Sequence, residues 1–410
     1  MKQIQTLSLA ILFALCASVQ AGECQGRTGA SAAALTRTSR PTFVSTKTET
    51  DNSSIETKSW GKTADGQQAF LYTLTNKKTG MTMSCTNRGA TIVSLTSADK
   101  NGKQENVVVG YDAIEKYDAD TPFFGAFIGR YGNRIANGQF AIDGVTYKLV
   151  INEPAHNVTL HGGAVGFDKR VLDAKAKDTP NGPAITFTIV SADGDQGFPG
   201  TLTASVTYTL SNDNELICHY AATTDKPTVC NLTQHTYFNL GAGDLSKENL
   251  NDSIELQIVA DNYNPVDKNL IPTAIAPVAG TPFDFRASKP IGKDHNVSCE
   301  QFTFTGGYDH NWVLNKQKPG ELTLAAVAKD PVSGRVMEVF TTEPGIQFYA
   351  GVALSGKNIV NGKPVAKRSA FCLETQHYPD SPNQKDFPST VLRPGEKYDS
   401  TTIYKFSVEK

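Results

Sequence analysis

Short segments in which apolar and polar residues alternate recur along most of the chain. This period-two alternation is typical of strands that bury one face, because successive side chains on a strand point to opposite sides. Turn-forming clusters at 100–102, 211–214 and 333–334 separate the segments. The clearest alternating segments are 69–74, 184–190, 201–210, 253–259 and 336–341.

Helical periodicity is nearly absent, and only 113–116 and 244–249 are candidates for short helices. Many short strands joined by turns predict an all-β sandwich or barrel. No repeat of fixed period and no internal linker divides this part of the chain, so residues 58–410 are expected to form one catalytic domain.

The N-terminal region has the composition of a targeting segment. Lys2 is followed by an apolar run at 7–19 and by small residues that end at Ala21. This order predicts a signal peptide over 1–21, because the run is too short to span a bilayer. A buried N-terminal helix is the alternative. Residues 22–57, rich in Ser and Thr, are expected to be a disordered linker, and the protein is expected to be exported, either secreted or periplasmic.

Charge and cysteine content limit the possible partners. The formal net charge of 410 residues is -2, so no global field attracts nucleic acid or an anionic membrane. The sequence has neither a dinucleotide-binding fingerprint nor a His-Glu-x-x-His pattern, and we expect no cofactor and no metal. Cys218 and Cys230 flank a predicted turn at 225–227 and could form a disulfide, but buried free thiols fit the sequence equally well.

Two strand-like segments carry the strongest candidates for proton transfer. In 231–240, strand alternation places His235 on one face with Thr233 and Tyr237. In 371–376, the same alternation places Glu374 on one face with its polar neighbours. A histidine and a carboxylate that face one cleft can move two protons in one reaction. A core histidine and a strand-edge ion pair are the structural alternatives.

Four further segments carry polar residues that suit a sugar ligand. Glycines in 125–138 let the backbone approach a ligand closely, and the same segment offers two hydrogen-bonding side chains. A phosphate-binding loop is not indicated there, because the Lys-Ser/Thr ending is missing. The other segments are 160–163, 306–312 and 341–349. Taken alone, 125–138 and 160–163 are better explained as an ordinary surface turn and loop, and 306–312 is a weak pattern. The candidate residues in these segments are Asn133, Arg134, His161, Asp309 and Gln347.

Taken in order, these segments resemble the aldose 1-epimerase (galactose mutarotase) family over residues 58–409. The matching motifs are Gly-Arg-x-x-Asn-Arg-Ile-Ala, Leu-His-Gly-Gly, Thr-x-His-x-Tyr-Phe-Asn-Leu, Asp-His-Asn, Pro-Gly-x-Gln-Phe-Tyr and Leu-Glu-Thr-Gln. The resemblance implies a large antiparallel β-supersandwich with a cleft for a small aldose. It also implies that His235 is the general acid and Glu374 the general base, and that the five residues named above position the sugar.

The resemblance implies mutarotation of free hexoses such as galactose and glucose. A free Glu has a pKa of ~4.3 and a free His ~6.5, so Glu374 is expected to be an available base and His235 an acid kept protonated by nearby carboxylates. A secreted carbohydrate-binding protein on the same scaffold is one alternative, although binding alone needs neither residue. A hexose-6-phosphate epimerase is the other, but no added basic cluster is present. A monomer or homodimer is expected.

Overall fold

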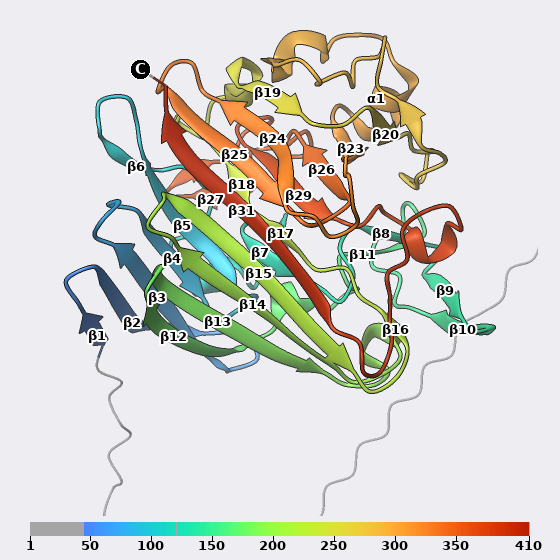
Figure 1. Ribbon diagram of the computed structural model, residues 1–410, viewed down its shortest axis with the longest axis horizontal. Helices are drawn as coiled ribbons and strands as arrows, with labels where there is room; N and C mark the ends of the chain where they lie inside the picture. Colours follow the sequence, from blue (N-terminus) through green and yellow to red (C-terminus); the bar gives the residue numbers. More distant parts are fainter. Residues whose placement is uncertain (1–44, 120–121, 410) are drawn as a thin grey trace, which may run out of the picture. The chain divides into compact units, whose positions relative to one another are not determined.

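The computed structural model describes residues 45–119 and 122–409, and most of its elements are β-strands (Figure 1). All strand pairs within its sheets are antiparallel. The prediction of an all-β architecture built from short strands is therefore confirmed. The predicted signal peptide, over 1–21, lies outside the described residues.

A nine-stranded sheet carries the long alternating segments. In β14 (Leu202–Leu210), for example, Leu202, Ala204, Val206, Tyr208 and Leu210 are buried, and the residues between them are more exposed. The strands of this sheet lie in the order β12 (Asp173–Thr179), β13 (Gly182–Ser191), β14, β15 (Glu215–Thr224), β31 (Tyr398–Val408), β25 (Arg335–Thr341), β24 (Thr323–Lys329), β19 (Glu255–Ile258) and β22 (Lys289–Pro290).

Two six-stranded sheets face this large sheet. The N-terminal one keeps sequence order: β1 (Thr46–Glu49), β2 (Ser53–Lys62), β3 (Gln68–Asn76), β4 (Thr82–Thr86), β5 (Thr91–Ala98) and β6 (Gln104–Asn106). The other, the site sheet, has the order β18 (Tyr237–Phe238), β29 (Phe371–Gln376), β26 (Gly345–Tyr349), β23 (Asp309–Val313), β20 (Asn262–Asn264) and β21 (Ala276–Pro277).

Five two-stranded ribbons complete the β-structure of the described residues. They are β7 (Ala126–Ile128) with β17 (Thr233–His235), β8 (Arg134–Ala136) with β11 (Val158–Leu160), β9 (Gln139–Ile142) with β10 (Val145–Lys148), β16 (Thr228–Val229) with β30 (Val391–Leu392), and β27 (Ile359–Val360) with β28 (Lys363–Pro364).

The helices are all short. The sequence indicated helices at 113–116 and 244–249. The first is confirmed as the 3₁₀ turn η1 (Ile114–Lys116), whereas 244–249 forms turns and η4 begins only after it. The one α-helix of the described chain, α1 (Glu300–Thr305), had no clear periodicity because its six residues make less than two turns. The other 3₁₀ turns are η2 (Phe167–Lys169), η3 (Asp195–Gly197), η4 (Leu250–Ser253), η5 (Ile291–Asp294) and η6 (Ser381–Asn383).

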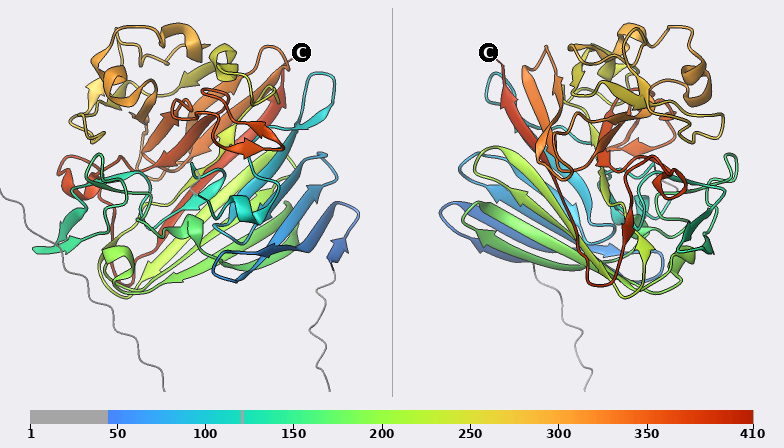
Figure 2. Two further views of the ribbon diagram at one scale, coloured as in Figure 1. Left: turned by 180° about the vertical axis from the view of Figure 1, so that it is seen from behind. Right: turned by 45° about the vertical axis from the view of Figure 1, so that its right-hand side comes forward.

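The core lies between the sheets. Figure 2 shows the N-terminal strands, in blue, against β12–β14, in green. Tyr72 and Phe187 make an edge-to-face contact across this interface, with ring centroids 5.9 Å apart. On the other half of the large sheet, Tyr404 of β31 packs against Phe238 at 5.1 Å and donates a hydrogen bond to Leu373 O at 3.0 Å. The large sheet thus supports the site sheet from behind.

The predicted linker over 22–57 extends too far toward the C-terminus. Strand β1 and half of β2 lie inside that range. All four residues of β1 are exposed and polar, so the strand has no apolar pattern. Its register with β2, Thr46↔Thr57 to Glu49↔Ser54, comes from backbone pairing at the sheet edge.

The fold also shows the state of the two cysteines. Cys218 and Cys230 are buried free thiols, so the hairpin disulfide is absent and the alternative is confirmed. Within 45–119 and 122–409, no helix has the length and apolar content needed to cross a membrane.

Candidate active site

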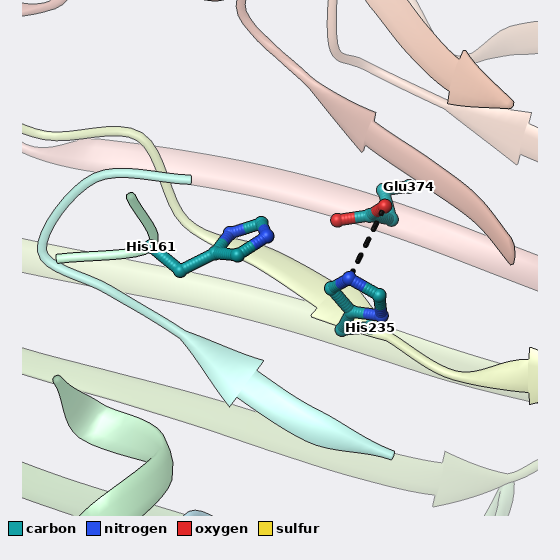
Figure 3. Close-up of side chains that lie close together, drawn as sticks. All are labelled: His161, His235 and Glu374. Atoms are coloured by element: carbon teal, nitrogen blue, oxygen red, sulfur yellow. Dashed lines mark ion pairs between the residues drawn. The ribbon is translucent and has the colours of Figure 1, made fainter. Parts of the chain in front are cut away.

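His235 and Glu374 approach each other from two different sheets. His235 ends β17, and Glu374 lies in the middle of β29, where it pairs in register with Gln347 of β26. His235 Nε2 lies 3.6 Å from Glu374 Oε1, and both side chains are buried. Figure 3 shows the two side chains facing each other, with His161 beside them. Two residues 139 positions apart thus face one space, as expected from the sequence.

The ring of His235 is held on three sides. Tyr237 stacks on it with centroids 5.1 Å apart, and Phe123 stacks at 5.7 Å. Cys372 Sγ lies 3.5 Å from Nδ1. Burial raises the pKa of the Cys372 thiol, which therefore keeps its proton and donates to Nδ1. This contact leaves Nε2 to carry the proton of the neutral ring, directed toward Glu374.

His161 is a neutral hydrogen-bond donor by the same reasoning. The backbone N–H of Asn133 donates to His161 Nδ1 at 3.1 Å, so the ring proton must lie on Nε2. Burial, followed by the nearby His235 and Arg134, lowers the pKa of His161 well below its usual value. Its backbone is in the left-handed region at φ 49°, and a Cβ at the neighbouring Gly162 would lie 2.0 Å from Gly129 O. Only glycine fits there.

The polar wall of the site is built around Arg134. Its guanidinium donates to Glu153 at 2.9 Å and 3.3 Å, and its NH1 lies 4.0 Å from Asp309 Oδ2. Burial works against the charge of Arg134, but Asp309 and Glu153 more than offset it and raise its pKa. Gln347 Nε2 donates to Asp309 Oδ1 at 2.7 Å. The guanidinium and the two carboxylates are thereby fixed before a ligand arrives.

The protonation of the central pair differs from the expectation. Burial lowers the pKa of His235 to about 4, so nearby carboxylates do not keep it protonated. Burial, with the charge of Asp309 adding to it, raises the pKa of Glu374 well above its usual value. Desolvation disfavours both charged forms. Between these two pKa values, the pair therefore holds one proton and has no net charge.

A cavity of about 370 Å³ opens above the pair. Its lining combines the polar residues of the site with the apolar side chains of Leu270, Phe304 and Val352. Glu374 Oε2 and Gln347 Oε1 are buried and have no hydrogen-bond partner within the described chain. Polar groups with free hydrogen-bonding capacity, set among apolar lining residues, are the surfaces that a small polyhydroxy ligand requires.

His161, His235 and Glu374 are the only group in the described part of the chain that could hold a metal ion. The ligand atoms of His161, His235 and Glu374 lie within 4.8 Å of one another. Two histidines and a carboxylate form a donor set that suits a divalent transition metal. The expectation that no metal is needed is therefore testable at this site.

All seven residues singled out from the sequence surround this one site. Asn133, Arg134, His161, His235, Asp309 and Glu374 line the cavity, and Gln347 contacts Asp309. Three contributors were given no role from the sequence: Phe123, Glu153 and Cys372. Cys372 had a usable signal, because it lies two residues before Glu374 and so on the same strand face. Nothing in the sequence distinguished Glu153 from other surface acids.

Comparison with known proteins gives a consistent result. A family model described as aldose 1-epimerase matches residues 71–405. Human galactose mutarotase is 46% identical over 322 residues, which cover 78% of this chain and 89% of the human protein. Aldose 1-epimerase of Escherichia coli (strain K12) is 39% identical over 351 residues, 84% of this chain and 97% of that protein.

Solved structures agree with the sequence relatives. An aldose epimerase homologue from C. elegans superposes with a TM-score of 0.72 at 32% identity, covering 81% of this chain and 97% of the other. Galactose 1-epimerase from Lactobacillus acidophilus NCFM gives a TM-score of 0.75 at 29% identity, covering 87% and 99%. The predicted mutarotase-like β-sandwich is thus confirmed.

Proposed function

The chain belongs to the aldose 1-epimerase family and interconverts the α and β anomers of free aldoses, and we propose that His235 and Glu374 carry the two protons of this reaction. The distance of 3.6 Å between His235 Nε2 and Glu374 Oε1 is the observation that supports this assignment. In a cyclic aldose, the anomeric hydroxyl and the ring oxygen are bonded to the same carbon, C1. Their acid and base must therefore be near neighbours.

In the proposed mechanism, the proton of the neutral pair first moves from Glu374 to His235, and the Glu374 carboxylate then takes the proton of the anomeric hydroxyl. The C1–O5 bond breaks with its electron pair moving to the ring oxygen, O5, which takes a proton from His235. The C1–O1 bond becomes a carbonyl. Rotation about C1–C2 presents the other carbonyl face, and the two groups return their protons with reversed roles. The pair thus carries one proton before and after ring opening, on His235 before the step and on Glu374 after it.

The surrounding residues hold the sugar while its ring opens. His161 offers its Nε2–H to a sugar oxygen, because its other nitrogen already accepts from Asn133 N. The side-chain oxygen of Asn133 accepts from Arg134 N at 2.9 Å, which leaves its amide N–H₂ for a hydroxyl. Asp309, anchored by Gln347 and Arg134, accepts from sugar hydroxyls.

Galactose and glucose are the proposed substrates, in keeping with the named activity of the relatives. The test is polarimetry on freshly dissolved α-anomers across a panel of free hexoses and pentoses. If wild type and Glu374→Ala equilibrate every sugar equally slowly, the assignment is wrong. The choice between epimers rests on few hydroxyl contacts, so we expect differences within about two orders of magnitude.

The two alternatives are less well supported. A binding protein needs no buried acid–base pair, and calorimetry that shows sugar binding without anomer exchange would favour it. A hexose-6-phosphate epimerase needs a phosphate site. The one arginine that lines the cleft is already engaged by Glu153 and Asp309. Rates on hexose and hexose 6-phosphate separate these activities.

We also propose that the protein is exported as a monomer or homodimer, without nucleic acid or membrane as partners. Export is supported by Lys2, the apolar run at 7–19 and Ala21. The absence of nucleic-acid and membrane partners is supported by the net charge of -2. Cell fractionation with N-terminal sequencing tests it, with Gly22 expected as the first residue of the mature protein. A cytoplasmic protein that retains its N-terminal segment would contradict the proposal. Light scattering gives the oligomeric state.

A further inference from the structure

A second cavity, distinct from the sugar cleft, lies beside the end of β29. It has a volume of about 520 Å³, against about 370 Å³ for the cleft, and the two share no lining residue. This end cavity is bordered by the link between β25 and β26, by the residues that follow β29, and by the start of β31. Its volume falls within the range of small-molecule sites.

A buried carboxylate and a histidine form part of the wall of the end cavity. Glu343 is buried, accepts a hydrogen bond from the Tyr398 hydroxyl at 2.7 Å, and lies 2.7 Å from His377 Nδ1. Burial works against the charge of Glu343, but the charge of His377 and the hydrogen bonds to the carboxylate outweigh it and lower the pKa of Glu343. The carboxylate is therefore ionised, and His377 Nδ1 donates to it. The other ring nitrogen, Nε2, has no partner in the described chain.

Most other polar groups of this cavity are already engaged. Lys316 Nζ donates to three oxygens of neighbouring residues, so all of its protons are used. Thr342 Oγ1 accepts from the backbone N–H of Thr401 at 2.9 Å. Among the buried and half-buried lining side chains that the structure describes, only His377 Nε2 and the Tyr378 hydroxyl have no partner. A ligand with many hydroxyls would bury most of them unpaired, which is costly, so the end cavity disfavours a sugar.

The rest of the wall is apolar and partly aromatic. The side chains that contribute this surface are Leu314, Pro344, Pro388, Tyr378 and Tyr398. Proline and tyrosine rings present flat surfaces, against which the face of a planar aromatic ring packs well. An aromatic ring that carries one hydroxyl therefore matches both the apolar surface and the few free polar atoms of the cavity.

We propose that the end cavity binds a phenol, an aromatic ring whose hydroxyl pairs with His377 Nε2. A hydroxyl suits this nitrogen whether or not it carries a proton, because a hydroxyl donates to a lone pair and accepts from an N–H. Glu343 holds the imidazole through Nδ1, so the orientation of Nε2 is fixed before a ligand arrives. This site is separate from the sugar cleft and does not depend on the function proposed above.

The probe is 2-naphthol, a fluorescent bicyclic phenol, and its binding is measured by fluorescence titration. We expect a Kd below about 1 mM, unchanged by saturating galactose because an aldose occupies the cleft. His377→Asn is the test variant. Its amide nitrogen takes the place of Nδ1 and can still donate to Glu343, whereas nothing replaces Nε2. Loss of one hydrogen bond should weaken 2-naphthol binding about three- to tenfold.

His295→Asn is the matched control. His295 is also a partly buried histidine beside a carboxylate, with Nδ1 3.4 Å from Asp252 Oδ2, and it does not line the end cavity. This variant should bind 2-naphthol as wild type does. A second measurement needs wild type alone: ¹⁵N NMR of the histidine rings should show an Nε2 signal that moves with 2-naphthol and not with galactose.

Three results would overturn the inference. The first is that wild type does not bind 2-naphthol, or binds it without moving such an Nε2 signal. The second is that galactose displaces 2-naphthol, which would place the phenol in the sugar cleft. The third is that His377→Asn binds 2-naphthol as tightly as wild type and His295→Asn do.

Discussion

Replacing Glu374 by Gln should change activity and stability in opposite directions. The side chain is buried, its Oε1 faces His235 at 3.6 Å, and its Oε2 has no partner in the described chain. Gln has nearly the same shape but cannot take a proton. Loss of one general base lowers kcat/KM by roughly 10²–10⁴-fold, or about 2.7–5.4 kcal/mol in activation free energy.

The free energy of unfolding should rise in the same variant. Burial and Asp309 raise the native pKa of Glu374 above its unfolded value of 4.5. Such a group favours the native state only when protonated, so its contribution falls as the pH rises from 4.5 through the native pKa. Near pH 8 the unfolded chain has released this proton, so the native wild type must either hold the proton or keep a poorly solvated carboxylate, and Gln removes that cost. We expect a gain on the order of 1–3 kcal/mol at pH 8, which vanishes toward pH 4.

Polarimetry gives the rate, and thermal unfolding between pH 4 and pH 8 gives the stability. Glu338→Gln is the matched control, because Glu338 is a half-buried strand carboxylate of β25 away from the cleft. It should change neither quantity. The reasoning fails if Glu374→Gln retains activity within about threefold of wild type. It also fails if its stability difference from wild type does not depend on pH.

Three further predictions concern protons and metals at the same site. In wild type, kcat/KM should fall as the pH drops through about 4, because His235 is then protonated and the pair holds two protons. A fall in kcat/KM between pH 6 and 7 instead would contradict the buried neutral ring. Cys372→Ala should remove the hydrogen bond to His235 Nδ1. ¹⁵N NMR would detect the result as mixed ring tautomers, and polarimetry as a lower kcat. Cys372→Ser should retain the wild-type tautomer. EDTA should leave the rate unchanged, and a rate lost to EDTA and restored by a divalent ion would show that His161, His235 and Glu374 hold a required metal.

The fold class could be predicted from the sequence because strand alternation is a local property. The segment 201–210 alternates strictly, and β14 occupies nearly the same residues. The edge strand β1 could not be predicted, since it buries none of its side chains and is a strand only because its backbone pairs with β2. Helix α1 was missed for a related reason, because six residues are too few to show a period.

The sequence also identified the residue types of the site, since each motif has a short and specific order. Strand parity alone placed Cys372 and Glu374 on one face. Which segments meet was not a local property: β17 and β29 belong to different sheets, and only their packing brings His235 to Glu374.

The protonation of the site was likewise decided by the tertiary structure. A sequence gives a histidine its free pKa, and His235 was expected to be a cation because nearby carboxylates would keep it protonated. Burial among Phe123, Tyr237 and Cys372 removes the water that would solvate the charge, and the ring becomes neutral. The sequence by itself determined which groups can exchange protons with a sugar. The packing around them determined how many protons they hold, because desolvation depends on neighbours that are remote along the chain.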